Sequence, residues 1–313
     1  MTRITNQNRL IAQYARACRD ELKYGCTFAT LSADSYIGGC RIRFHSPLSA
    51  AAEWSGEKGQ IGNGMAIKAV ETDPVTGDET VSLVHLYTDT AIWEIKKSSG
   101  WNYWRATEFK HPMGRPLMEP LIWDATTIKP FGRSRLKEPI RRLIQGYVRT
   151  IANATISLEF ATSPQKFILG VTDDQYDKLV NQKFKQYVGS IIAATTNPES
   201  GTPPEFGQLP QGSLSPHVEM LRLLATQFSA ATGLTVMDTG VINDANPTSS
   251  DAILAQSQTL VLLAEQLNAG NGDSLYTIAQ MAQAIARSVR LEALTDEERA
   301  VVPHFKSPAM PSI

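Results

Sequence analysis

The chain has 313 residues, enough for one large or two ordinary domains and for a buried core that needs no disulfides. Hydrophobic residues make up 42% and charged residues 19%, a balance that excludes both a largely disordered chain and an integral membrane protein. With 30 Lys and Arg against 31 Asp and Glu, the net charge of -1 excludes a generally basic nucleic-acid binder but not a local basic surface.

No export or membrane segment is recognisable. No run of 18 apolar residues occurs, so we expect no transmembrane helix, and residues 1–10 lack the apolar stretch of a signal peptide. Cys18, Cys26 and Cys40 are odd in number and form no CxxC motif, which disfavours a disulfide framework or a zinc knuckle. We therefore expect free thiols in a reducing cytoplasm, no cofactor and no membrane partner.

The first 130 residues read as a β-rich domain. A helix over 10–22, stopped by Gly25, comes first. Alternating apolar and polar residues then predict strands, with a turn-forming segment at 73–79 between two of them. The predicted strands are 27–32, 39–45, 66–71, 81–87 and 91–96. This order favours an antiparallel meander.

From residue 131 the pattern becomes helical. Apolar residues recur every three or four positions between Leu136 and Leu158, which predicts one long helix with a narrow apolar seam. Pro139 fits only a first helical turn, so the helix should begin near Glu138, and it should end before the Ser-Pro pair at 163–164.

A small α/β segment and further helices are expected to follow. Strands at 166–171 and 205–209 flank a helix at 173–195, and Pro216 and Gly233 delimit a helix over 215–232. After an irregular stretch at 234–247, a helix opens at 248, breaks at the glycines of 270–273 and resumes from 274 to 294. Residues 301–313 read as a flexible tail. The whole pattern predicts an α+β fold.

Catalytic motifs are weak. SxxK occurs at 134–137 and at 55–58, but the downstream elements of penicillin-binding enzymes are missing. No Walker-type phosphate loop or paired metal-binding histidines occur. An enzyme that uses His85, Asp89 or Ser134 stays as a lesser alternative, in the form of a two-domain hydrolase.

Two charge features carry more information. Residues 132–150 contain six basic residues and a single acidic one, Glu138. This excess of positive charge indicates either a solvated helix face or a stripe that faces phosphates. By contrast, no Lys or Arg occurs from Leu223 to Ala286, so the 234–247 stretch cannot clamp phosphates firmly.

The order of the motifs resembles the portal proteins of tailed bacteriophages of the siphophage type, over roughly residues 5 to 290. The motifs are FGRSRL at 131–136, SPQKFILG at 163–170, FGQLP at 206–210 and NPTSSDAI at 246–253. The resemblance implies a homo-oligomeric ring, commonly a dodecamer, at a capsid vertex of the virion, assembled from subunits made in the host cytoplasm. It also implies partners: double-stranded DNA that passes through the ring, the terminase large subunit, the major capsid protein and the head–tail connector. It implies no catalytic activity.

The resemblance assigns a role to each region. Residues 1–130 correspond to the wing, 131–162 and 215–233 to two antiparallel stem helices, 163–214 to the clip, 234–247 to the tunnel loop, and 248–300 to wing and crown-base helices. The residues expected to face DNA from the tunnel loop are Thr235, Asp238, Thr239, Asn243, Asp244 and Asn246. The basic stem residues, expected at a subunit interface or the channel, are Arg133, Arg135, Arg141, Arg142 and Arg149. The clip residues expected to meet terminase or the connector are Lys178, Lys183, Lys185, Glu199 and Glu205.

This sequence departs from the family pattern in two respects. Family members are usually longer at both ends, so we expect a truncated or short member. The tunnel loop carries only acidic and neutral polar residues, so a basic loop that grips phosphates is not available. Another structural or adaptor protein of the virion is the main alternative.

Overall fold

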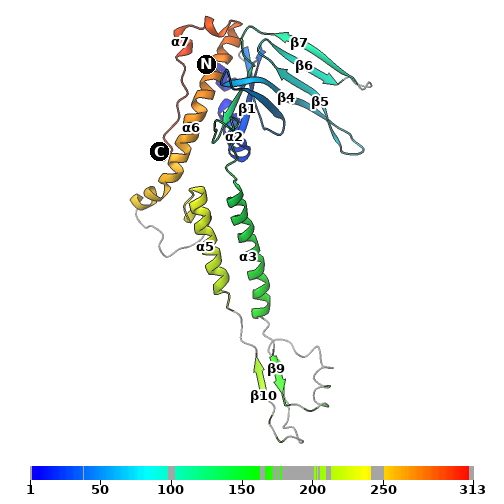
Figure 1. The fold of residues 1–313 in the computed structure, drawn as a ribbon, viewed down its shortest axis with the longest axis vertical. Helices are drawn as coiled ribbons and strands as arrows, with labels where there is room; N and C mark the ends of the chain where they lie inside the picture. Colours follow the sequence, from blue (N-terminus) through cyan, green and yellow to red (C-terminus); the bar gives the residue numbers. More distant parts are fainter. Residues whose placement is uncertain are drawn as a thin grey trace. The chain divides into compact units, whose positions relative to one another are not determined.

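A computed structural model describes residues 2–37, 39–97, 103–162, 166–170, 205–208, 213–240 and 250–309, and the isolated positions 172, 174, 177, 201 and 203. The fold is α+β with antiparallel sheets, as the sequence predicts (Figure 1). The chain divides into two compact units, which are described separately below. The first comprises residues 1–137 and 247–313, and the second comprises residues 138–246.

The first unit contains two antiparallel sheets. The three-stranded sheet has the order β2-β1-β8 and the five-stranded sheet the order β3-β4-β5-β6-β7. The strands of the smaller sheet are β1 (Cys26–Asp34), β2 (Gly39–His45) and β8 (Met118–Ile122). Those of the larger sheet are β3 (Ala50–Ser55), β4 (Gln60–Thr72), β5 (Glu79–Tyr87), β6 (Ala91–Lys97) and β7 (Trp104–Lys110). The larger sheet is an antiparallel meander, with each strand paired to the next along the chain. The predicted strands 66–71, 81–87 and 91–96 lie in it, whereas 27–32 and 39–45 belong to the smaller sheet and β3, β7 and β8 were not predicted.

Helices pack on the smaller sheet and close the core. They are α1 (Thr2–Gln7), α2 (Leu10–Tyr24) and α6 (Ser250–Arg287). Fully buried side chains from β1, β2, β8 and α6 form this core, namely Leu31, Ile42, Met118, Ile278 and Met281. The unit therefore depends on contacts between the N-terminal 130 residues and a helix more than 100 residues later.

The predicted break at 270–273 is wrong, because α6 continues through it without interruption. Asn271 is fully buried there, and its Nδ2 donates to Glu21 Oε2 at 2.9 Å and to Tyr14 Oη at 3.1 Å. A Cβ on Gly270 would lie 3.7 Å from the Ile122 carbonyl oxygen, and one on Gly272 3.9 Å from the Phe305 ring. Both distances are ordinary van der Waals contacts, so neither glycine is required for space, and tertiary packing overrides their low helix propensity.

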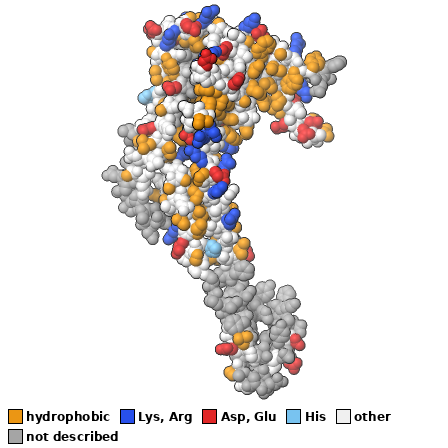
Figure 2. All heavy atoms as spheres, in the orientation of Figure 1, with side chains coloured by type: hydrophobic (Ala, Val, Ile, Leu, Met, Phe, Trp, Pro, Cys, Tyr) orange, Lys and Arg blue, Asp and Glu red, His pale blue; other side chains and the backbone are white. Residues whose placement is uncertain are grey.

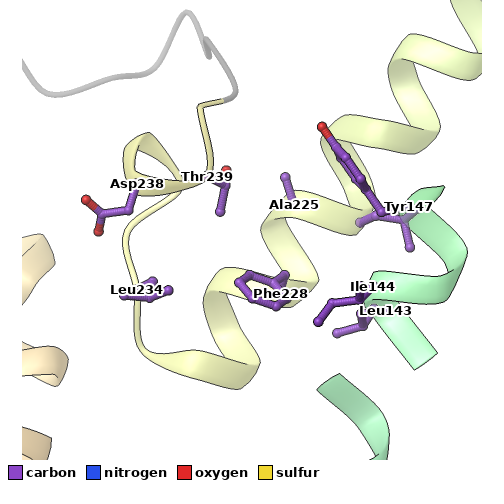
Figure 3. A pocket seen from close by; sticks show the side chains of 9 residues that line it. Leu143, Ile144, Tyr147, Ala225, Phe228, Leu234, Asp238 and Thr239 are labelled. Carbon is purple, nitrogen blue, oxygen red and sulfur yellow. The ribbon is translucent and has the colours of Figure 1, made fainter. Parts of the chain in front are cut away.

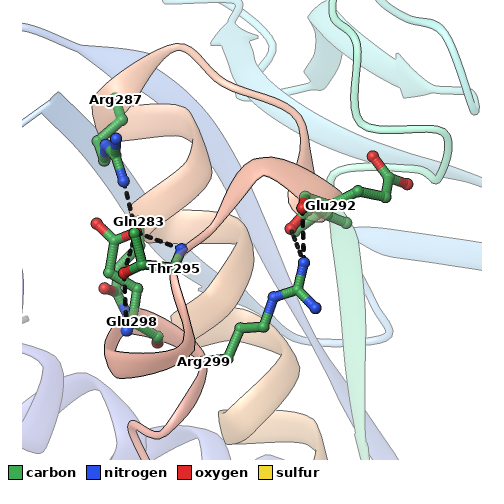
Figure 4. Close-up of polar contacts among 7 residues, drawn as sticks. Gln283, Arg287, Glu292, Thr295, Glu298 and Arg299 are labelled. Atoms are coloured by element: carbon green, nitrogen blue, oxygen red, sulfur yellow. Dashed lines mark hydrogen bonds and ion pairs between the residues drawn. The ribbon is translucent and has the colours of Figure 1, made fainter.

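The described C-terminal residues 288–309 contact α6. The chain turns through η2 (Leu291–Ala293) and α7 (Asp296–Arg299), where Thr295 and Glu298 form a reciprocal capping box. Figure 4 shows Glu298 paired with Arg287 and the Arg299 guanidinium donating to backbone carbonyls. Farther on, Phe305 lies 6.2 Å from the Tyr14 ring and lines a cavity beside α6. The segment therefore folds back onto α6.

The described part of the second unit contains two α-helices, a 3-10 turn and a two-stranded antiparallel sheet. Its elements are α3 (Glu138–Thr162), β9 (Lys166–Leu169), β10 (Glu205–Gln208), α5 (Ser215–Thr232) and η1 (Met237–Thr239). The predicted bounds of both helices are confirmed, and Gly233 ends α5 in the left-handed conformation with φ of 73°. The two predicted strands pair with each other, antiparallel. The helix predicted at 173–195 lies outside the described residues. Among the described helices, none has the length and apolar character needed to cross a bilayer.

Candidate functional site: the α3–α5 helix pair

The contacts between α3 and α5 show that the two helices lie side by side and antiparallel. Near the end of α3, Ser157 Oγ is 3.1 Å from Nε2 of His217, in the first turn of α5. Near the middle, a Cβ on Gly146 would lie 3.4 Å from Leu224 Cδ2. Gly146 therefore lies opposite Leu224, which is buried there, at a distance that an added Cβ would make an ordinary contact. A glycine inside a predicted helix is a signal from which this contact could have been expected.

At the other end of the pair, an apolar cavity of about 230 Å³ opens between the helices and the segment that follows α5. Figure 3 shows side chains from α3, α5 and the 234–239 segment around it. Its apolar lining residues are Leu143, Ile144, Tyr147, Leu224, Ala225, Phe228 and Leu234. Only Asp238 and Thr239 add polar side chains, so the cavity suits an apolar group rather than a charged one.

Most apolar side chains of the pair remain exposed in the single chain. Among the large apolar residues of α3 whose side chains the structure describes, only Ile140 is buried, whereas Val148 is 61% exposed. The exposed apolar residues of the two helices are Ile144, Tyr147, Val148, Ile151, Ile156, Leu158, Val218, Met220 and Leu223. Large apolar side chains exposed in this number on two neighbouring helices point to an interface with another protein.

The basic residues of α3 are exposed and are not part of a buried network. At 100° per residue, Arg142 and Arg149 lie on the face opposite the apolar seam, and Arg141 lies at its flank. Arg142 Nε donates to Glu138 Oε1 at 2.9 Å across one helical turn. An exposed pair of this kind contributes little to stability, so these side chains are available to a partner.

Arg133 and Arg135 belong to the first unit rather than to the stem helix. The Arg133 backbone N–H donates to Trp123 O at 3.0 Å and that of Arg135 donates to Leu22 O at 2.8 Å. The basic stripe expected on one helix is thus divided between two units, because the 131–137 segment is held against the end of α2.

The described part of the tunnel loop folds locally. Both the backbone N–H and the hydroxyl of Thr235 donate to Asp238 Oδ2 at 2.9 Å, and Thr239 Oγ1 donates to Val236 O at 2.6 Å. These three candidate residues thus form one turn, in which Asp238 is exposed. The candidates Asn243, Asp244 and Asn246 lie outside the described residues.

Only one clip candidate can be located. Glu205 begins β10 and is exposed. Lys178, Lys183, Lys185 and Glu199 lie outside the described residues.

The three side chains of the hydrolase alternative each have a different partner. His85 Nε2 is 3.4 Å from Glu94, Asp89 accepts from Lys58 Nζ at 2.6 Å, and Ser134 Oγ donates to Lys23 O at 2.6 Å. None of these contacts joins two of the three candidates. Within the described ranges, no group of three His, Cys, Asp or Glu side chains is placed to hold a metal ion.

The chain was compared with known families and proteins. No family model matches it, and no curated protein is detectably similar to it in sequence.

Proposed function

We propose that the protein is the subunit of a tailed-phage portal: a ring at the capsid vertex that conducts double-stranded DNA during packaging and ejection. In this role the chain has no catalytic activity of its own. The terminase large subunit drives the DNA, and the ring also contacts the major capsid protein and the head–tail connector. The motif order at 131–136, 163–170, 206–210 and 246–253 is one support for this proposal.

The observation that carries the proposal is the exposed apolar surface of the α3–α5 pair. The 25 residues of α3 make a helix about 37 Å long and the 18 residues of α5 one of about 27 Å, and the two helices leave most of their large apolar side chains exposed. Copies arranged around an axis would cover these side chains, with helix packed beside helix. The exposed arginines of α3 would then face a neighbouring copy or the channel.

The absence of basic side chains from the described part of the tunnel loop fits a conduit better than a clamp. The exposed carboxylate of Asp238 accepts hydrogen bonds from Thr235, and its negative charge would repel phosphates rather than bind them. DNA that must move through a channel needs weak contacts of this kind.

We expect the double substitution Val148→Glu/Leu223→Glu to abolish assembly of the full chain. Both side chains are more than half exposed in the single chain, so the fold should lose less than about 0.5 kcal/mol, whereas buried carboxylates at a subunit interface should prevent association. Mass photometry across a concentration series measures the assembly.

Asn153→Glu/Gln227→Glu is the matched control. It adds the same charge to exposed polar positions of the same two helices, and we expect it to assemble. Normal assembly of the apolar-face variant would remove the basis of the proposal.

A further inference from the structure

The β4–β5 hairpin extends beyond the rest of its sheet. The neighbouring strands stop early: β3 pairs with β4 as far as Ala66, and β6 pairs with β5 from Leu83 onward. Residues 70–81, here called the arm, pair only with each other within the described strands. Every residue from Glu71 to Thr80 is exposed. Because an isolated two-stranded ribbon is marginally stable in water, an arm of this kind needs a partner surface.

The arm nevertheless has a defined end. Asp73 Oδ1 accepts from the backbone N–H groups of Val75 and Thr76 at 2.7 and 3.2 Å, and Gly77 adopts a φ of 75°. These bonds hold the pKa of Asp73 below its usual range. A turn fixed in this way loses little conformational entropy when it docks.

The side chains at the end of the arm are apolar and acidic. Val75 is 91% exposed at the apex, and Val70 is 45% exposed opposite Val81. Glu71, Asp73, Asp78 and Glu79 flank them, and the sequence from 69 to 95 has no Lys or Arg. Figure 2 shows these acidic and apolar side chains together at the end of the hairpin. A complementary surface would be basic at its rim and would cover a small apolar group.

The first unit itself carries a surface with the opposite charge. The end of α2 and the segment after β8 come together there: Ser134 Oγ donates to Lys23 O, and the Gly132 N–H donates to Lys129 O at 3.0 Å. The basic surface formed in this way consists of Lys23, Lys129, Arg133 and Arg135. Lys23, Lys129 and Arg133 are exposed. The acidic residues of this region are Asp20, which lies near Lys23, the buried Glu21, and Asp124, which pairs with Lys137 at 3.1 Å. None of the ion pairs found among the described residues joins the arm to this basic surface within one chain.

We propose that the arm of one copy docks on the basic surface of a second copy. The contact places Val75 against the partner and sets the acidic side chains of the arm opposite Lys23, Lys129 and Arg133. The inference rests on the proposed ring, because it supplies a contact between neighbouring subunits. This contact belongs to the first unit and is separate from the α3–α5 surface.

The test is a charge exchange in the full chain. Asp78→Lys/Glu79→Lys reverses the arm without touching the turn-forming carboxylate of Asp73, and Lys23→Glu/Arg133→Glu reverses the basic surface. Each variant alone should raise the protein concentration needed for half-assembly by about tenfold or more. The combined variant should recover to within about threefold of the wild type, and salt should weaken the wild-type contact. Glu57→Lys/Glu297→Lys is the control, since it makes the same charge change at exposed positions elsewhere.

The outcomes separate this contact from the ring. If the wild type assembles and the arm variant assembles equally well, the docking contact is wrong and the proposed function stands. If the basic-surface variant loses binding to linear duplex DNA while the arm variant assembles normally, the surface serves nucleic acid and the inference is overturned. If the wild type stays monomeric at all concentrations, both proposals fail. Failure of the combined variant to recover would also contradict the pairing.

Discussion

Replacing Glu21 with glutamine is expected to stabilise the protein at pH 8 by up to about 3 kcal/mol. Glu21 lies on α2 with no exposed surface, and one of its oxygens accepts from Asn271 while Oε1 has no hydrogen-bond partner among the described residues. Burial raises the pKa of Glu21 from 4.5 to about 7, although the Asn271 hydrogen bond lowers it in part. Among the described residues, no basic side chain offsets the buried charge: the groups around it are the Tyr14 hydroxyl, the Cys18 and Cys26 thiols and the Asn271 amide.

The direction of the pH dependence follows from this pKa. Since the folded state holds the proton more tightly than the unfolded state, the contribution of Glu21 to stability is complete below pH 4.5. It is lost as the pH rises from 4.5 through about 7, and it does not change further at higher pH. A glutamine keeps the neutral form at every pH, and its N–H can donate to the unpartnered Oδ1 of Asn271.

Urea unfolding between pH 4 and 8.5 measures the effect. The difference in unfolding free energy between Glu21→Gln and the wild type should grow from near zero at pH 4 to its maximum above pH 7. Burial also raises the pKa of Glu119 to about 7, although the charge of Arg115 lowers it in part. Because Glu119 is present in both proteins, its contribution cancels in the difference. Glu57→Gln, at an exposed site, serves as the control. A variant that is less stable than the wild type at pH 8 would contradict the assignment.

Gly132→Ala is expected to destabilise the first unit by about 3 kcal/mol or more. Gly132 has a φ of 71°, and a Cβ there would lie 2.0 Å from Trp123 O and 2.8 Å from Gly25 O. Both obstacles are backbone atoms, one at the end of β8 and the other in the C-cap of α2, so neither can rotate away. The substitution should therefore separate α2 from the segment that leads into α3.

Gly77→Ala is the matched control for this prediction. Gly77 has nearly the same φ, 75°, but its added Cβ would meet open space. It should cost only the left-handed backbone strain, about 1 to 2 kcal/mol. Thermal and urea unfolding of the two variants compare the costs. Equal losses would show that the close approach at Gly132 contributes nothing.

The elements predicted correctly are those with strong local signals. The bounds of α3 follow from the spacing of its apolar residues, Pro139 and the Ser-Pro pair after it, and those of α5 from Pro216 and Gly233. The strands that were missed have weak local signals. Every residue of β7 is exposed, so no alternation marks it, and β3 begins with three alanines. Pro120 argues against a strand at 118–122, yet β8 is an edge strand, where a proline is tolerated.

The site was predicted less completely than the fold. The antiparallel helix pair was expected, but the contacts that align it, Ser157 with His217 and Gly146 with Leu224, join positions more than 50 residues apart. The basic stripe was treated as continuous along one helix, whereas Arg133 and Arg135 are bound by backbone hydrogen bonds to the first unit. The periodicity of apolar residues along α3 predicts that the helix has an apolar side. It cannot predict how much of that side α5 covers, and so how much stays exposed.

Electron microscopy of the purified full chain, with and without linear double-stranded DNA, tests the central claim most directly. The account predicts closed rings with an axial channel wide enough for a DNA duplex, in which α3 and α5 of adjacent subunits pack side by side around the axis. A uniform population of monomers or closed compact dimers at high protein concentration, with no ring in any class average, would contradict it.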